Sequence, residues 1–99
     1  MIVHIVMFRF KEENKEQNIS QAKEMLEALV EKIEELVSME VGVNFDASQR
    51  AFDLSLYSKF SSKEDLEVYA LHPAHLEVVA FIKSVTVESK VVDYVLTEK

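Results

Sequence analysis

The chain has 99 residues, 48% of them apolar, with 11 Lys and Arg against 18 Asp and Glu and a formal net charge of −7. These values are typical of one globular domain over residues 1–99 and exclude a disordered tail. The acidic balance argues against nucleic acid or an anionic membrane as a partner. The absence of cysteine excludes a disulfide framework and fits a cytoplasmic protein.

The first predicted element is a strand over residues 2–10, IVHIVMFRF, because Val, Ile and Phe dominate it. Its even and odd positions are both apolar, which predicts a central strand covered on two sides. A capping box is predicted at Asn14 and Gln17. Apolar residues then recur from Ile19 to Leu36 at spacings of three and four, which predicts a helix that packs on a sheet. No apolar run approaches the ~20 residues of a membrane-spanning helix.

Two further strands are predicted over residues 39–45 and 52–60, because apolar and polar residues alternate in both. The polar turn between them predicts a hairpin. Gly42 is the only glycine, which suggests a bulge or a close backbone approach within the first of these strands. Ser61 and Glu64 form a second capping-box pattern, which predicts the start of another helix.

The second helical region contains the segment 69–75, YALHPAH, with the only proline. Proline fits the first turn of a helix and pushes the residue before it out of the α region. We therefore predict that one helix ends near Leu71 and another begins at Pro73. His75 would lie in the first turn of the second helix, where the positive end of the helix dipole disfavours an imidazolium. A neutral His75 at pH 7 is expected, with Tyr69 facing it across the bend.

Residues 85–96 are strand-like, with an interruption at residues 88–90 that indicates either a loop or a bulge. The predicted order is β-α-β-β-α-β, the ferredoxin-like α+β pattern with a four-stranded antiparallel sheet. In this pattern the first and third strands are central and the helices cover one face. The second helix is broken at Pro73.

The alternation of the strands predicts which residues face the helices. That face carries His4, Val6, Phe8, Leu54 and Leu56. The opposite face would carry Val3, Ile5, Met7, Tyr57, Val92 and Tyr94. A soluble monomer rarely exposes such a patch, so we predict a C2 homodimer that packs sheet against sheet as a dimeric α+β barrel.

Four segments of the sequence together resemble the stress-responsive A/B barrel (Dabb) family: HIVMFRFK, FDLSLYSKF, SSKEDLEVYALHPAH and VVDY. The resemblance covers nearly the whole chain, and the Y-x-x-HPxH segment with the terminal D-Y is its specific part. It implies a dimeric α+β barrel. A plant branch of the family contains polyketide cyclases in which a Tyr and a His act as an acid/base pair.

Carried over by motif, the cyclase pair falls on Tyr69 and His75 in this sequence. His4 matches the family's first-strand histidine, and His72 matches the first histidine of HPxH. The cyclase branch also has a pocket histidine on the third strand, where this sequence has Leu54. The resemblance therefore extends further for the fold than for the cyclase reaction.

One functional hypothesis is cyclase- or isomerase-like proton transfer on an apolar, carbonyl-bearing small molecule held between sheet and helices. Tyr69 would be the acid and His75 the base. The expected substrate-binding residues are His4, Val6, Phe8, Leu54, Leu56 and His72. The alternatives are a non-catalytic, stress-related dimer with a filled core, and a cofactor-free monooxygenase-like protein.

Each candidate residue also has a structural interpretation. Tyr69 and His75 are also compatible with a packed tyrosine that bonds a helix-capping histidine, and His4 with a satisfied core histidine. His72 fits a cap before Pro73, and Asp93 fits a partner for a basic side chain across strands. The three histidines have no HExxH pattern and no carboxylate at ligand spacing, so we expect no metal and no cofactor.

Overall fold

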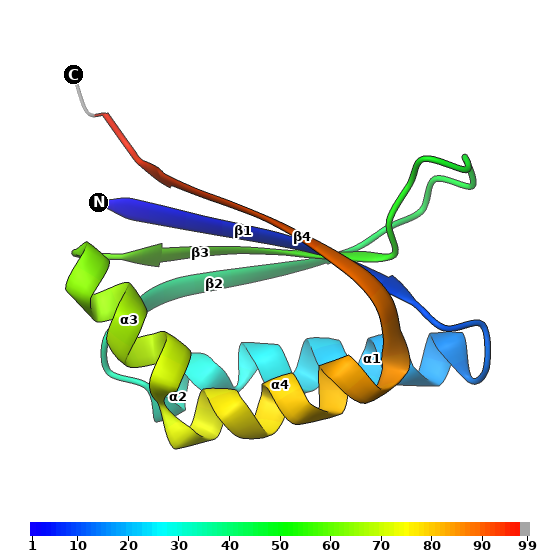
Figure 1. The fold of residues 1–99 in the computed structure, drawn as a ribbon, viewed down its shortest axis with the longest axis horizontal. Helices are drawn as coiled ribbons and strands as arrows, with labels where there is room; N and C mark the ends of the chain where they lie inside the picture. Colours follow the sequence, from blue (N-terminus) through cyan, green and yellow to red (C-terminus); the bar gives the residue numbers. More distant parts are fainter. Residues whose placement is uncertain (98–99) are drawn as a thin grey trace.

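A computed structural model describes residues 1–97, with eight elements around one antiparallel sheet (Figure 1). In chain order they are β1 (Ile2–Phe10), α1 (Lys15–Glu27), α2 (Leu29–Lys32), β2 (Leu36–Val43), β3 (Leu54–Phe60), α3 (Lys63–Leu71), α4 (Pro73–Val85) and β4 (Thr86–Val95). The sheet has the strand order β2-β3-β1-β4, and all its pairings are antiparallel. The predicted ferredoxin-like fold, its central strands β1 and β3, and the helix break at Pro73 are confirmed.

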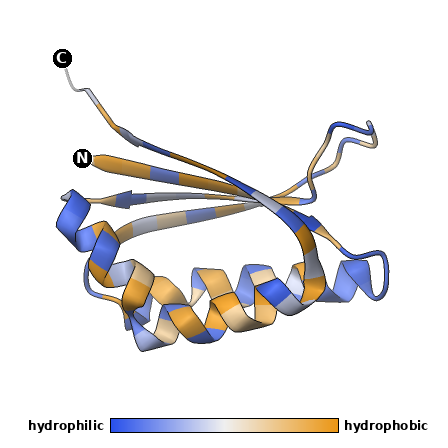
Figure 2. Cartoon of the chain, viewed as in Figure 1, coloured by the Kyte–Doolittle hydropathy of each residue, from blue (hydrophilic) through white to orange (hydrophobic). Residues whose placement is uncertain are grey.

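The helices all lie on one side of the sheet (Figure 1). Apolar residues colour most of β1 and alternate along α4, whereas the loop after β1 and the start of α1 are hydrophilic (Figure 2). Leu54, Leu56 and Phe8 are buried on the helix side, and Val6 packs partly buried against them. The predicted phase of these strands is therefore confirmed, and it brings His4 to the same face.

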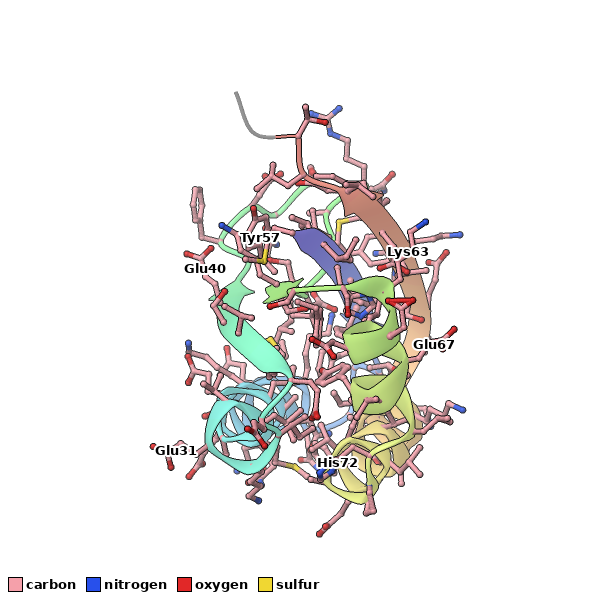
Figure 3. All side chains as sticks on the ribbon, turned by 90° about the vertical axis from the view of Figure 1, so that its left-hand side faces the viewer. Glu31, Glu40, Tyr57, Lys63, Glu67 and His72 are labelled. Carbon is pink, nitrogen blue, oxygen red and sulfur yellow. The ribbon has the colours of Figure 1, made fainter. Side chains whose placement is uncertain are left out.

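The opposite face of the sheet is only partly covered within one chain. Val3 is completely buried, whereas Met7 and Tyr94 are each 40% exposed and Val92 is 58% exposed. Tyr57 and Glu40 lie at this side of the sheet, away from the helical layer (Figure 3). The exposed fraction of the apolar side chains on this face is thus larger at Met7 than at Val3, and polar side chains lie among them.

The first helix is shorter than the apolar stripe predicted. Helical structure pauses at Ala28 and ends at Lys32, and Leu36 opens β2 instead of closing the helix. Ile33 and Leu36 are both buried, and the Leu36 N–H donates to the Ile33 carbonyl at 3.2 Å across the turn. Ile33 and Leu36 keep the three-residue spacing because both ends of the turn point into the core. The apolar spacing therefore extends beyond the end of the helix.

Both predicted capping boxes are wrong in detail. Asn14 precedes α1 with φ 55° and ψ 31°, a left-handed conformation that asparagine tolerates, and its side chain makes no cap bond. Its carbonyl instead accepts from the Asn18 N–H at 2.9 Å. Before α3 the cap is Ser62, whose Oγ accepts from the Asp65 N–H at 3.1 Å. The two adjacent serines made the pattern ambiguous by one residue.

β2 differs from the prediction at its end and at its glycine. β2 ends at Val43, so Phe45 lies outside the sheet and is fully exposed. Gly42 pairs regularly with Ser55 and marks no bulge; a Cβ at Gly42 would lie 3.4 Å from the Ser55 Oγ. The glycine therefore lies in a regular strand, where a Cβ would come into van der Waals contact with the Ser55 hydroxyl.

β4 is one strand over Thr86–Val95, which excludes a loop at residues 88–90 and agrees with the alternative of an irregularity within a longer strand. Residues 88–90 pair with β1 in register, and the register shifts immediately before them, because Arg9 pairs with Glu88 and Phe10 with Thr86, which leaves Val87 of β4 without a partner in this pairing. Glu88 and Lys90 form an ion pair at 3.3 Å, and Glu88 also accepts from Arg9 at 3.4 Å. The charge of Glu88 is thus compensated by Lys90 on the same edge strand and by Arg9 on the neighbouring strand β1.

None of the helices within residues 1–97 combines the length and apolar character needed to span a membrane.

Candidate functional site

The break between α3 and α4 sets the geometry of the site. His72 is extended, with φ −64° and ψ 134°, and its Nδ1 accepts from the Ala74 N–H at 3.0 Å. This capping bond starts α4 at Pro73, as the proline predicted. Tyr69 thereby lies in the last turn of α3 and His75 in the first turn of α4. Their ring centroids are 4.2 Å apart, with an angle of 39° between the planes.

His75 has a defined tautomer in its neutral form. Its Nδ1 lies 3.1 Å from the Ala70 carbonyl oxygen, which can only accept, so Nδ1–H donates and Nε2 keeps its lone pair. Burial lowers the pKa of His75 below its ordinary value, the Ala70 bond partly opposes this, and the charges of His4 and His72 lower it further. The predicted neutral His75 agrees with this direction, although desolvation is its main cause.

Tyr69 is the most unusual polar residue of the site. It is 1% exposed, and its hydroxyl has no hydrogen-bond partner among residues 1–97. Burial raises the pKa of Tyr69 well above its ordinary value, so the side chain stays a neutral phenol. A buried hydroxyl without a partner is costly, and a ligand oxygen placed beside it would accept its proton.

His4 lies on the same side of the sheet and pairs with Asp93. The two residues are partners in the β1–β4 register, and the His4 Nδ1 contacts the Asp93 Oδ1. The cross-strand partner predicted for Asp93 is therefore His4. The His4 ring centroid is 6.3 Å from that of Tyr69 and 6.4 Å from that of Phe60.

These three side chains line one cavity of about 150 Å³ between the sheet and α4. Its walls come from β1, β3, β4 and the helices, and they are mostly apolar. The lining residues are His4, Val6, Phe8, Leu26, Leu56, Tyr69, His75, Val78, Val79, Ile82, Lys83, Thr86 and Ser89. The sheet and α4 therefore leave space between them that side chains do not fill.

The cavity brings together most of the predicted site, with two departures. His72 does not line it; the ring is used for the cap and lies within the helical layer (Figure 3). Leu54 also lies outside the lining, although its partner Phe8 on β1 lines the cavity, and its side chain is packed into the core. Neither residue is placed to contact a ligand there.

Sequence reasoning missed the half of the lining that comes from α4 and β4. Val79 and Lys83 follow His75 at steps of four residues, and Val78, Ile82 and Thr86 form a second series with the same step that begins three residues after His75. Residues at these spacings lie on the same face of a helix as His75. The helical period was therefore the signal in the sequence that could have identified these lining residues. Ser89 enters through its pairing with Phe8, which a sequence alone does not give.

Among residues 1–97 there is no group of three or more His, Cys, Asp or Glu side chains arranged to hold a metal ion. His72 and His75 use their Nδ1 atoms in bonds to the backbone. The expectation of no metal and no cofactor stays a prediction.

A four-stranded antiparallel sheet with helices on one face and a partly apolar opposite face defines a ferredoxin-like α+β protein. The family model described as Stress responsive A/B Barrel Domain, Dabb, matches residues 2–96. The chain therefore belongs to the Dabb family, as its sequence segments indicated.

A curated relative is a stress-response A/B barrel domain-containing protein of Arabidopsis thaliana. It is 35% identical over 79 residues, which cover 80% of this chain and 30% of the plant protein. The chain thus spans about a third of the length of that relative.

Two solved structures show how widely the fold is used. A dimeric ferredoxin-like protein of unknown function from Bacteroides fragilis is 31% identical with a TM-score of 0.86, covering 94% of this chain and 93% of that one. A hydroxynitrile lyase from Passiflora edulis is 20% identical with a TM-score of 0.87, covering 99% and 94%. Two further structures, from Thermobifida fusca and Jannaschia, are described as dimeric ferredoxin-like proteins of unknown function.

Proposed function

We propose that the cavity binds a small apolar molecule with a carbonyl group and catalyses proton transfer next to that carbonyl. The single observation that supports this most is the buried Tyr69 hydroxyl without a protein partner among residues 1–97, beside a His75 whose Nε2 is free. The hydroxyl supplies one donor for an oxygen, and the imidazole supplies one base. Tyr69 and His75 both line an apolar-walled cavity that His4 also lines.

The proposed step needs only these two groups. His75 Nε2 takes a proton from the carbon next to the carbonyl, the C–H electron pair moves into the C–C bond, and the carbonyl oxygen becomes an enolate oxygen. The Tyr69 O–H donates to that oxygen as its charge grows. His4 orients the substrate, with Asp93 fixing its ring. Return of the proton to another atom completes an isomerisation, and attack by the enolate carbon on a second carbonyl completes an aldol-type closure.

The size of the cavity limits the substrate. A cavity of about 150 Å³ is comparable to one that holds a single benzene ring. We therefore propose substrates with one ring, or an alkyl chain of similar volume. Leu54 stands where the cyclase branch has a pocket histidine, so proton transfer at one carbonyl is the reaction proposed first.

The assembly proposed with this site is a homodimer through the sheet face opposite the helices. Met7, Val92 and Tyr94 present apolar surface there, and a relative of 31% identity is described as dimeric. A second copy would cover this surface, which supports the interpretation as a dimeric α+β barrel. A cytoplasmic location stays a prediction.

The function is tested by exchange of the methyl protons of acetophenone in D₂O, followed by NMR. The wild type should accelerate the exchange, and Tyr69→Phe and His75→Ala should each lower the rate by about two orders of magnitude. Tyr57→Phe is the matched control, because Tyr57 lies on the other sheet face (Figure 3). Cleavage of mandelonitrile is a second assay, since a protein of this fold is a hydroxynitrile lyase.

Two outcomes would decide against the proposal. If acetophenone binds but its protons exchange at the background rate, the cavity is a binding site and the acid–base roles are wrong. Equal rates for the wild type and Tyr69→Phe would remove Tyr69 from the step. Binding without exchange would favour the non-catalytic interpretation of the protein.

A further inference from the structure

The cavity has polar groups at two separate places along its wall. The first, which we call the histidine end, consists of His4, Tyr69 and His75. The second, the lysine end, consists of Lys83, Thr86 and Ser89. The proposed proton transfer uses only the histidine end, so the lysine end has no role in that reaction.

The two ends are separated along both walls of the cavity. His75 and Lys83 are eight residues apart in α4, so their backbone positions are about 12 Å apart along the helix axis at a rise of 1.5 Å per residue. On the sheet, Ser89 pairs with Phe8, which is four residues from His4 along β1. The backbone positions of Phe8 and His4 are therefore about 13 Å apart along the strand. The wall between the ends is apolar and is formed by Val6, Leu56, Val78, Val79 and Ile82.

The lysine end offers hydrogen-bond donors and a positive charge. No carboxylate within residues 1–97 forms an ion pair with the Lys83 ammonium. Thr86 Oγ1 donates to the Ile82 carbonyl at 2.9 Å, so its proton is already used. A second ammonium is close by, since Lys11 Nζ donates to the carbonyl of Ser84, the residue after Lys83, at 3.0 Å.

The nearest carboxylate along the chain is neutralised. Glu88 precedes Ser89 but pairs with both Arg9, at 3.4 Å, and Lys90, at 3.3 Å. Because strand residues alternate, Glu88 points to the sheet face opposite Ser89. On a chain with a net charge of −7, this end of the cavity is therefore locally cationic.

We propose that Lys83, with Ser89 beside it, binds the carboxylate of an elongated ligand whose carbonyl lies at the histidine end. The ligand class is an apolar keto acid with about one ring, or an equivalent chain, between the two groups. This inference rests on the proposed function and names the substrate class for the same cavity. The apolar wall selects an apolar ring or chain between the two polar groups of the ligand. Lys83 selects the orientation in which the carboxylate lies at the lysine end.

The test compares two ligands that differ in one group. Acetophenone carries the carbonyl alone, and 4-acetylbenzoate carries a carboxylate at the opposite end of the ring. Dissociation constants are measured by NMR titration at low salt for the wild type, for Lys83→Gln and for a control, Lys63→Gln. Lys63 lies on α3, outside the cavity lining (Figure 3).

The wild type should bind 4-acetylbenzoate up to about fivefold more tightly than acetophenone, the range of an exposed ion pair. Lys83→Gln should abolish this preference, measured as the ratio of the two dissociation constants, whereas Lys63→Gln should keep it. The preference should also shrink with added salt. If Lys83 only stabilises the C-terminal turn of α4, the preference will be the same in all three proteins, and the inference is overturned.

The remaining outcomes separate this inference from the proposed function. If acetophenone binds and 4-acetylbenzoate binds no better in the wild type, the carboxylate assignment is wrong and the proposed function stands. If neither ligand binds the wild type, the proposed function fails, and the inference fails with it.

Discussion

Replacing Tyr69 by phenylalanine should stabilise the protein while it weakens the proposed reaction. The substitution removes one hydroxyl from a residue that is 1% exposed, and that hydroxyl has no partner among residues 1–97. Burying an unbonded hydroxyl costs about 1–3 kcal/mol, so its removal should raise the free energy of unfolding by up to that amount. For a chain of this size, each 1 kcal/mol corresponds to roughly 4–8 °C in Tm.

The Tyr69→Phe ring should keep its packing, because the aromatic neighbours remain. The Phe60 ring centroid lies 4.9 Å from that of Tyr69 and the His75 ring centroid 4.2 Å, and neither contact involves the hydroxyl. The assay is urea unfolding at one fixed protein concentration, because a dimer's stability depends on concentration. A change in the midpoint at constant m-value reports stability alone.

The sign of the change in the free energy of unfolding of Tyr69→Phe shows whether the hydroxyl lacks a partner in the protein. A water in the cavity that bonded the hydroxyl would bring the gain toward zero, whereas a protein partner would make the variant less stable. A loss of about 1 kcal/mol or more would therefore refute the view that the hydroxyl awaits a ligand oxygen.

Three further predictions follow from the same structure. Burial lowers the pKa of His75, so its stabilising contribution is complete above about pH 6.5 and is lost as the pH falls through the lowered pKa. Urea midpoints at several pH values should show this loss, and in His75→Asn the midpoint should depend less on pH. Met7→Lys with Val92→Lys should shift light scattering at micromolar protein from dimer to monomer, and a monomeric wild type would contradict the proposed dimer. Ser62→Ala should cost about 1 kcal/mol in thermal unfolding and Ser61→Ala close to nothing, since only Ser62 caps α3; equal losses would contradict that cap.

The sequence predicts those parts of the fold that depend on local chemistry. Pro73 defines the helix break because its ring and missing N–H act on adjacent residues, whatever the rest of the chain does. The alternation of β1 and β3 predicts the face that carries His4 and Leu56, because a strand's period is fixed. The cap at Ser62 was placed one residue too early, because two serines offer the same hydroxyl and only the path of the chain selects one.

The sequence alone does not predict the parts that depend on pairing between distant residues. Ser89 reaches the cavity through the β1–β4 register, and Asp93 meets His4 through the same register. Leu36 continues a helical spacing and yet begins a strand, because tertiary packing decided where the chain turns. Leu54 has the correct phase but does not line the cavity, whose extent depends on how α4 sits over the sheet.

The three histidines illustrate how one side chain acquires three roles from its bonding partner. His72 Nδ1 accepts from a backbone N–H, so in the neutral ring the proton must be on Nε2. His75 Nδ1 donates to a backbone carbonyl, which puts the proton on Nδ1 and leaves Nε2 basic. His4 Nδ1 faces a carboxylate, which also selects the Nδ1–H form.

These assignments predict different ¹⁵N spectra for His72 and His75 in the neutral state. Imidazole nitrogen shifts at about pH 8, where the free side chain is neutral, should report the Nε2–H form for His72 and the Nδ1–H form for His75. His72→Asn, which keeps a capping side chain, identifies the His72 signals by their loss. An Nε2–H tautomer at His75 would turn its lone pair toward the backbone, and the ring could then not act as the base that the proposed reaction requires.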